Sequence, residues 1–168
     1  MPRSFDMATE YGGTVEQVHR AFSDEGYWLA RLSDSGADHA TLDAMVLDAA
    51  GNLHITTTQT LRADRLPAVV TQFHRGDLSL VRKEIWTPVS EQRASAVVHG
   101  SIPGAPANLT GEAVLMPAGP GSQMQVAATI EVRVPLLGGK IENFIGRQLA
   151  DLLTAEQRFT TVWITENR

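Results

Sequence analysis

A change of hydrophobic period near Pro135 constrains the fold of this chain more than any other feature of its sequence. Before it, apolar and polar residues alternate as in a strand with one buried face, and the apolar positions are Met124, Val126, Ala128, Ile130, Val132 and Val134. After Gly138-Gly139, spacings of three, four and seven predict a long amphipathic helix, with apolar positions Ile141, Phe144, Ile145, Leu149, Leu152, Phe159, Val162 and Trp163. About 24 helical residues would span roughly 36 Å, which is enough to cross a whole sheet.

The rest of the chain reads mainly as strands separated by turn residues. Period-two patterns and turn signals predict strands near residues 3–10, 41–48, 53–61, 78–87, 93–102 and 108–117. Two short helices are expected after the first strand, because Thr14 and Gln17 form a capping box and Asp24 can cap a second helix. A brief helical segment is also expected over residues 66–74.

This order predicts an α+β fold, in which a curved antiparallel sheet of about six to seven strands wraps round a long C-terminal helix. A helix is about 10 Å across, whereas six strands spaced about 4.8 Å apart form a layer about 25–30 Å wide. One helix cannot fill that layer, so we expect an internal cavity. The sequence contains no repeat and no long linker, and we therefore expect one ligand-binding domain over residues 1–168.

Composition narrows the chemistry that such a cavity could support. The chain has no cysteine, which excludes disulfides and thiol catalysis, and its five histidines show no metal-ligand spacing. We expect no metal and no cofactor, and no motif identifies catalytic residues. The net charge of −5, with scattered Lys and Arg, argues against a nucleic-acid partner. No signal peptide or bilayer-spanning stretch is recognisable, so we expect a cytoplasmic protein without stable membrane insertion.

The strand over residues 80–86 carries the strongest candidates for polar groups in the cavity. Arg82, Glu84 and Trp86 share one of its faces, and Lys83 lies on the other. If the first face is concave, these three residues line the pocket and Glu84 is a buried acid or base. If it is convex, Arg82 and Glu84 form a solvated ion pair and Trp86 packs on the surface. Trp86 favours shelter while Lys83 requires water, and the sequence leaves both arrangements open.

Other candidates come from elements that we expect to border the cavity. Two polar positions of the strand over 53–61 share the parity of its apolar positions and are expected to point inward. Aromatic residues of the second short helix and of segment 66–74 either pack in the core or form a gate for the ligand. Two apolar residues of the long helix are expected in the core and in the cavity wall. The inward polar positions are Thr57 and Gln59. The aromatic residues are Tyr27, Trp28 and Phe73, and the two residues of the long helix are Phe144 and Leu152.

Four further segments allow comparison with a known family. They are the Glu-x-Trp strand at 80–86, the Gly-x-Pro hairpin at 104–111, the strand-to-helix junction Val-Pro-Leu-Leu-Gly-Gly-Lys within 134–142, and the helix end at 156–163. In these segments the chain resembles an actinobacterial family of uncharacterised START-like proteins. This family is related to the SRPBCC superfamily of polyketide cyclases, lipid-transport proteins and birch-pollen allergens. The resemblance implies a START-like helix-grip fold and a hydrophobic cavity, and it brings no catalytic residues.

Fold and resemblance together lead to a functional hypothesis. We expect the protein to bind a hydrophobic or amphipathic small molecule, such as a lipid, acyl or polyketide-like compound, as a carrier or sensor. Two alternatives stay open. One is a cyclase- or dehydratase-type enzyme that uses Glu84 with Arg82, or His54 or His99, for acid–base chemistry. The other is a homodimeric interaction module with a vestigial pocket.

Overall fold

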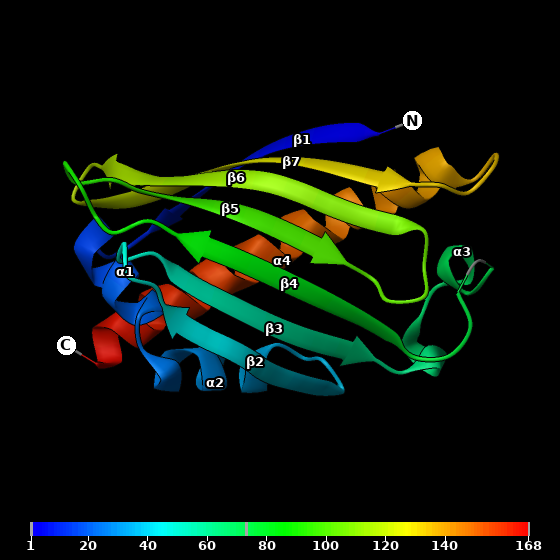
Figure 1. Cartoon of the computed structure of the whole chain (residues 1–168), viewed down its shortest axis with the longest axis horizontal. Coiled ribbons are helices and arrows are strands. Elements are labelled where there is room, and N and C mark those ends of the chain that lie inside the picture. The colour runs from blue at the N-terminus through cyan, green and yellow to red at the C-terminus, as the bar shows by residue number, and fades with distance from the viewer. Residues whose placement is uncertain (1, 73, 168) are drawn as a thin grey trace.

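The computed structural model describes residues 2–72 and 74–167, and within them the elements follow the expected order (Figure 1). The strands are β1 (Arg3–Tyr11), β2 (His39–Leu47), β3 (Leu53–Leu61), β4 (Leu78–Trp86), β5 (Ala94–Ser101), β6 (Ala107–Ala118) and β7 (Gly121–Val132). The helices are α1 (Val15–Phe22), α2 (Glu25–Asp34), α3 (Ala68–Thr71) and α4 (Gly138–Glu166), and a short 3-10 helix, η1, spans Ala63–Arg65.

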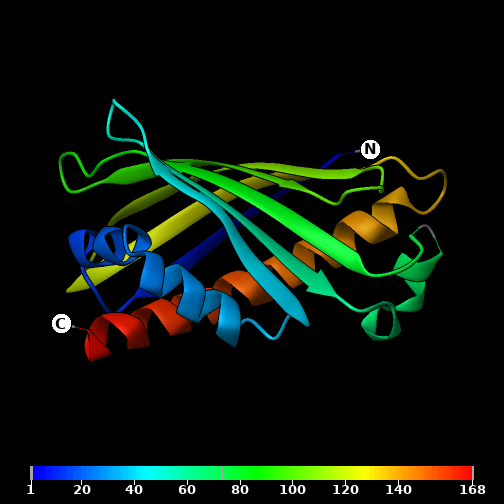
Figure 2. The ribbon, with the colours of Figure 1, turned by 60° about the horizontal axis from the view of Figure 1, so that its bottom comes forward.

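The strands form one seven-stranded sheet in the order β1-β7-β6-β5-β4-β3-β2. Every neighbouring pair in this sheet is antiparallel. The sheet curves, and α4 crosses its concave side diagonally, as Figure 2 shows. The predicted fold, a curved antiparallel sheet round a long C-terminal helix with two short helices after the first strand, is therefore confirmed.

The short helices α1 and α2 lie at one end of the sheet, beside the C-terminal half of α4 (Figures 1 and 2). The expected capping box is present: the Gln17 amide donates to the Thr14 hydroxyl at 3.2 Å, and the Thr14 amide donates to the Gln17 side chain at 2.8 Å. Asp24 caps α2 by accepting a hydrogen bond from the Gly26 amide at 2.8 Å. The main core lies beneath these helices, and its aromatic members are Tyr11, Phe22, Tyr27, Trp28 and Trp86.

A tight corner joins β7 to α4 at the opposite end of the sheet. A Cβ atom on Gly138 would lie 2.6 Å from the carbonyl oxygen of Val132, so only glycine allows this close approach. One turn later, the fully buried Glu142 accepts a hydrogen bond from the Val132 amide at 2.9 Å. The glycine and the carboxylate together hold the start of α4 against the end of β7.

Three boundaries differ from those expected. The brief helical segment expected over 66–74 is present but shorter: α3 spans only Ala68–Thr71, because Leu66 and Pro67 before it have an extended backbone, and η1 lies outside that range. The strand β7 ends at Val132: the Arg133 amide still donates in register to the carbonyl of Pro106 at 2.8 Å, but Pro106 has no N–H with which to continue the ladder. Helix α4 has 29 residues instead of about 24, because its last turns pack on the core through the buried Ile164.

Candidate functional site

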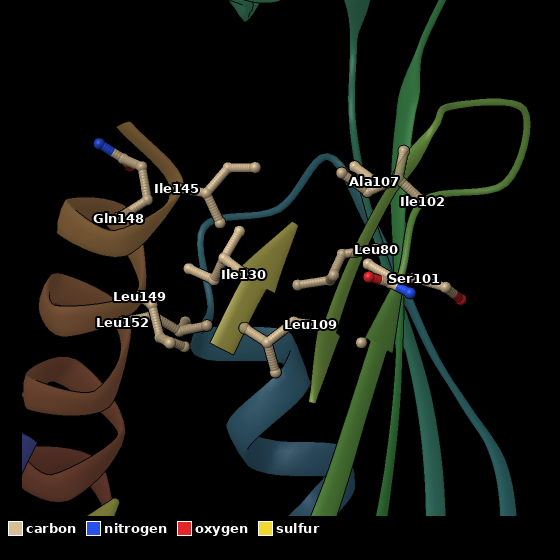
Figure 3. Close-up of a pocket in the computed structure, with 12 residues that line it drawn as sticks. Leu80, Ser101, Ile102, Ala107, Leu109, Ile130, Ile145, Gln148, Leu149 and Leu152 are labelled. Atoms are coloured by element: carbon tan, nitrogen blue, oxygen red, sulfur yellow. The ribbon is translucent and has the colours of Figure 1, made fainter. Parts of the chain in front are cut away.

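The concave side of the sheet and the first half of α4 enclose an apolar cavity of about 120 Å³, the outer cavity. Leucine and isoleucine side chains face one another across it in Figure 3, namely Leu80, Leu109 and Ile130 from the sheet and Ile145, Leu149 and Leu152 from α4. Gln148, which lines the outer cavity from α4, is exposed, whereas the exposed Ser101 and Asn108 lie on the opposite face of their strands from Gly100 and Leu109. The outer cavity therefore reaches the protein surface.

A second cavity of about 70 Å³, the inner cavity, adjoins the outer one. The two cavities share five lining residues, which are Leu80, Gly100, Leu109, Leu149 and Leu152. The wall of the inner cavity also contains aromatic and charged side chains, among them Tyr11, Phe22, Arg31, Arg82, Glu84, Trp86 and Glu156. The apolar space near the surface thus leads toward buried charged groups.

Small residues on the inward face of β5 and β6 leave this space open. Gly100 pairs with Leu109 across the two strands, and Gly111 pairs with Val98. The neighbouring inward positions are buried alanines, Ala94, Ala96 and Ala113. Strands usually carry larger β-branched or aromatic residues. Because glycine and alanine extend less far from the sheet, α4 cannot close the gap with its own leucines.

Four charged side chains, the ion cluster, meet at the inner cavity: Arg31 from α2, Arg82 and Glu84 from β4, and Glu156 from α4. The Oε2 atom of Glu156 lies 2.7 Å from Nη2 of Arg31 and 2.7 Å from Nη2 of Arg82. The Nε atom of Arg82 lies 3.3 Å from Oε2 of Glu84. Each side chain is at most 12% exposed. The cluster is therefore buried, and two guanidinium groups balance two carboxylates.

Burial and charge act in opposite directions on this cluster. Burial by itself would raise the pKa of Glu156, but the guanidinium groups of Arg31 and Arg82 outweigh it and hold that pKa below its usual value. Burial would likewise lower the pKa of both arginines, and the Glu156 carboxylate reverses this and raises the pKa of each. Glu156 and the two arginines therefore stay charged at neutral pH.

Groups behind the ion cluster hold Arg31 in place. Its Nη1 atom donates to the hydroxyl of Tyr27 at 3.1 Å, and its guanidinium carbon lies 4.5 Å from the centre of the Trp28 ring. The hydroxyl groups of Tyr27 and Thr160 are 2.6 Å apart, and Thr160 donates to the carbonyl of Glu156 at 2.7 Å. Because the Thr160 proton is used in that bond, Tyr27 donates to Thr160. This chain of hydrogen bonds ties α2 to α4.

Two atoms of the ion cluster lack a hydrogen bond. Trp86 Nε1 donates to Oε1 of Glu84 at 3.2 Å, which leaves the other oxygen of that carboxylate. Within the described residues, Glu84 Oε2 and Arg82 Nε are buried and have no hydrogen-bond partner, although their 3.3 Å separation makes them an ion pair. Both residues line the inner cavity. A buried donor and acceptor in this state favour any molecule that can bond to them.

The remaining polar chemistry near the inner cavity is limited. The Tyr11 hydroxyl donates to the sulfur of Met124 at 3.9 Å, a weak acceptor. Within residues 2–72 and 74–167, no three His, Asp or Glu side chains are grouped so that they could hold a metal ion.

In the same part of the chain, no helix is long and apolar enough to cross a membrane.

The structure decides which face of β4 lines the cavity. Arg82, Glu84 and Trp86 are buried on the concave side, and Lys83 between them is exposed. Of the two arrangements that the sequence left open, the concave one is present. The apolar indole of Trp86 is buried and the charged ammonium group of Lys83 is exposed to solvent, as the chemistry of each requires.

The aromatic residues of α2 pack in the core. Tyr27 and Trp28 are 0% exposed, and the Tyr27 ring lies 5.8 Å from the ring of Phe159, in the second half of α4. The outer cavity opens beside the first half of α4, at Gln148. Tyr27 and Trp28 are thus members of the core and line neither the outer nor the inner cavity, and a gating role for them stays a prediction.

The other selected positions fall in different environments. Leu152 lines both cavities, whereas Phe144 is half-buried and lines neither. Thr57 is buried and Gln59 is half-buried, and neither lines the outer or the inner cavity. Phe73 lies outside the described residues. A role for these side chains in ligand binding stays a prediction.

Sequence reasoning did not select Arg31 or Glu156, although each carries a signal. Glu156 interrupts the apolar face of the last helix, four residues after Leu152 and three before Phe159. Arg31 follows Tyr27 by one helical turn and so lies on the same helix face. A charged residue on an apolar helix face predicts a buried ion pair. Its partner, however, comes from another element and is visible only in three dimensions.

Comparison with known proteins identifies the family. A family model described as a protein of unknown function, DUF2505, matches residues 6–164. The chain belongs to this family. Uncharacterized proteins of Mycobacterium bovis (Mb0491c) and Mycobacterium tuberculosis H37Rv (Rv0481c) are each 51% identical over 173 residues, covering 99% of both chains. The expected resemblance to an actinobacterial family of uncharacterised proteins is confirmed.

Solved structures share the fold of this DUF2505 chain. The crystal structure of TTHA0849 from Thermus thermophilus matches with a TM-score of 0.62, 14% identity and 98% of each chain covered. One part of the di-domain ARO/CYC StfQ of steffimycin biosynthesis matches with a TM-score of 0.66 and 12% identity, over 99% of this chain and 52% of that chain. A START superfamily protein from Mycobacterium smegmatis matches with a TM-score of 0.55 and 13% identity, over 98% and 99%. The START-like fold is thereby confirmed.

Proposed function

We propose that this DUF2505 protein binds a hydrophobic or amphipathic small molecule between its sheet and α4, as a carrier or sensor. The observation that carries the proposal is the pair of adjoining cavities, apolar toward the surface and charged at the inner end. Apolar walls supply affinity by removing ligand surface from water, and a few polar groups fix its orientation.

The size of the cavities favours a small ligand, or the end of a longer one. The outer and inner cavities measure about 120 Å³ and about 70 Å³, and a cavity of about 150 Å³ is known to hold benzene. Roughly six to eight non-hydrogen atoms would therefore fit without rearrangement. A ligand with a longer alkyl chain would fit only if Leu149 and Leu152, which border both cavities, moved away from the sheet.

Ligand binding can be measured directly on the purified full chain. Native mass spectrometry is expected to show a bound hydrophobic molecule from the expression host. Thermal unfolding with hexan-1-ol, octan-1-ol and benzyl alcohol provides a second measurement. A concentration of about 100 Kd stabilises by about 2.7 kcal/mol, and at roughly 2–4 °C per kcal/mol the Tm rises by about 5–11 °C.

A matched pair of substitutions on α4 locates the binding site. Leu152→Trp fills the space where the two cavities meet, and Val162→Trp places the same side chain on the exposed face of the same helix. The alcohols should lose their Tm increase in the first variant and keep it in the second. The proposal fails if no probe raises the Tm of the natural protein, or if Leu152→Trp keeps the full increase.

A further inference from the structure

The balance of charges around the inner cavity determines whether a charged or a neutral group of a ligand can enter it. Arg31 and Arg82 provide two positive charges, and Glu84 and Glu156 provide two negative charges, within side chains at most 12% exposed. Both guanidinium groups are already paired with Glu156. A ligand carboxylate or ammonium would therefore enter as an additional buried charge without a free partner, which is strongly unfavourable.

The two atoms without hydrogen bonds define which chemical group of a ligand could bond to both of them. Arg82 Nε offers one N–H donor, Glu84 Oε2 offers one acceptor, and the two atoms are 3.3 Å apart. Both atoms are buried, so a ligand oxygen reaches them only when the two side chains move apart slightly; placed about 2.8–2.9 Å from each atom, it would have normal hydrogen-bond lengths to both. That oxygen accepts from Arg82 Nε and donates its own proton to Glu84 Oε2. Only a group that is donor and acceptor at one atom fits, and among the groups that an organic ligand can carry, a hydroxyl is the simplest of these.

We infer that the inner cavity selects a neutral ligand that ends in a hydroxyl group, and that Arg82 and Glu84 bind this hydroxyl. The apolar part of the molecule lies along the leucines shared by both cavities, with its hydroxyl at the ion cluster. This inference rests on the proposed function, because it names the ligand class for the same cavity. A fatty acid, a phosphate ester and an amine are the classes that it excludes.

Trp86 provides a local reporter for the inference. Its indole N–H donates to the second oxygen of the Glu84 carboxylate at 3.2 Å, so a new hydrogen bond to Glu84 changes its surroundings. The chain has three tryptophans, and hence three indole N–H signals in a ¹H–¹⁵N spectrum of the full chain. The variant Trp86→Phe assigns the relevant signal by its loss.

Four probes with alkyl chains of similar length separate the possible ligand ends: hexan-1-ol, hexyl methyl ether, sodium hexanoate and hexylammonium chloride. The alcohol, the ether and the ammonium ion share a hexyl chain, hexanoate has a pentyl chain on its carboxylate, and the ether carries a methyl group in place of the hydroxyl proton. A hydrogen bond to a charged acceptor is worth about a 10- to 100-fold change in affinity. Hexan-1-ol is therefore expected to bind at least about 10-fold more tightly than each of the others and to move the Trp86 signal.

A substitution at Glu84 should reverse the preference. Glu84→Gln keeps the size of the side chain and an oxygen for the Trp86 bond, but it leaves the ion cluster with one net positive charge. Hexan-1-ol should then bind about 10-fold more weakly, and hexanoate should become the tighter of the two. Glu112→Gln, the same change at an exposed position of β6, should leave all four affinities unchanged.

The outcomes distinguish this inference from the proposed function. If all four probes bind equally, or if hexanoate, hexylammonium or the ether matches hexan-1-ol, the hydroxyl inference is wrong while cavity binding stands. If no probe binds, the cavity function fails and the inference with it. If Glu84→Gln does not fold, the four affinities of the natural protein decide the question alone.

Discussion

Replacing Glu156 by glutamine tests the ion cluster most directly. The amide has nearly the same size and keeps one oxygen, but it removes the negative charge that Arg31 and Arg82 share, each at 2.7 Å. Only Glu84 then remains to balance the two guanidinium groups, so the buried cluster gains one net positive charge. The substitution leaves α4 otherwise unchanged, because glutamine and glutamate have similar helix propensities.

The expected loss of stability follows from burial. Removing one partner of a buried ion pair costs about 3–5 kcal/mol, whereas an exposed pair is worth only about 0–1 kcal/mol. The Glu156 side chain is 12% exposed and the two arginine side chains are 8% and 9% exposed, so the buried range applies. At roughly 2–4 °C per kcal/mol for a chain of this length, the Tm should fall by about 6–20 °C.

Urea unfolding followed by tryptophan fluorescence measures the change in the free energy of unfolding. Asp151→Asn is the matched control, since it removes one carboxylate charge from an exposed position of the same helix. The control should change the stability by less than about 0.5 kcal/mol. An unchanged slope with urea concentration would show that both variants unfold by the same transition.

The pH dependence of the free energy of unfolding provides an independent test of the charge on Glu156. The pKa of Glu156 is lowered in the folded protein by Arg31 and Arg82, against the effect of burial. Its contribution to stability is therefore complete above the ordinary carboxyl pKa, and it is lost as the pH falls through the lowered folded value. Glu156→Gln should remove this part of the acid dependence, so the two proteins should converge in stability at low pH.

A destabilisation below about 1 kcal/mol at neutral pH would refute this reasoning. Such a value is typical of solvated pairs on a protein surface. It would mean that water screens the charges of Arg31 and Arg82, and the inner cavity would then tolerate a charged ligand end.

Three other predictions concern stability and titration. Gly146→Ala places a Cβ atom 2.4 Å from the ring of Phe5, and urea unfolding should show a loss of about 1–3 kcal/mol from overpacking; a gain, as helix propensity alone would give, contradicts the contact. Burial raises the pKa of Tyr11 and Tyr27, the two tyrosines of the chain, above the ordinary value of 10.0. Phenolate absorbance should therefore appear only on unfolding, and its appearance in the folded protein would disprove this burial. Glu142→Ala leaves the last amide of β7 without its hydrogen-bond acceptor. The free energy of unfolding should fall by about 1–3 kcal/mol, and hydrogen exchange of that amide should become faster. An unchanged exchange rate would contradict the hydrogen bond.

Most of the fold follows from local patterns. The alternation in β7, the capping box of Thr14 and Gln17, and the glycines that begin α4 each depend on residues a few positions apart, and each is present as expected. Backbone geometry explains this success, because side chains alternate along a strand and recur every three or four residues along a helix. The width of a sheet relative to one helix even predicted the cavity.

The sequence by itself therefore determined the elements, their order and the presence of a hollow between them. Only the tertiary structure decided that Arg82 and Glu84 face inward and that Arg31 and Glu156 meet them there. Period two separates the two faces of a strand but does not say which face is concave. The partners of a buried charge come from α2, β4 and α4, so the ion cluster exists only once packing brings those elements together.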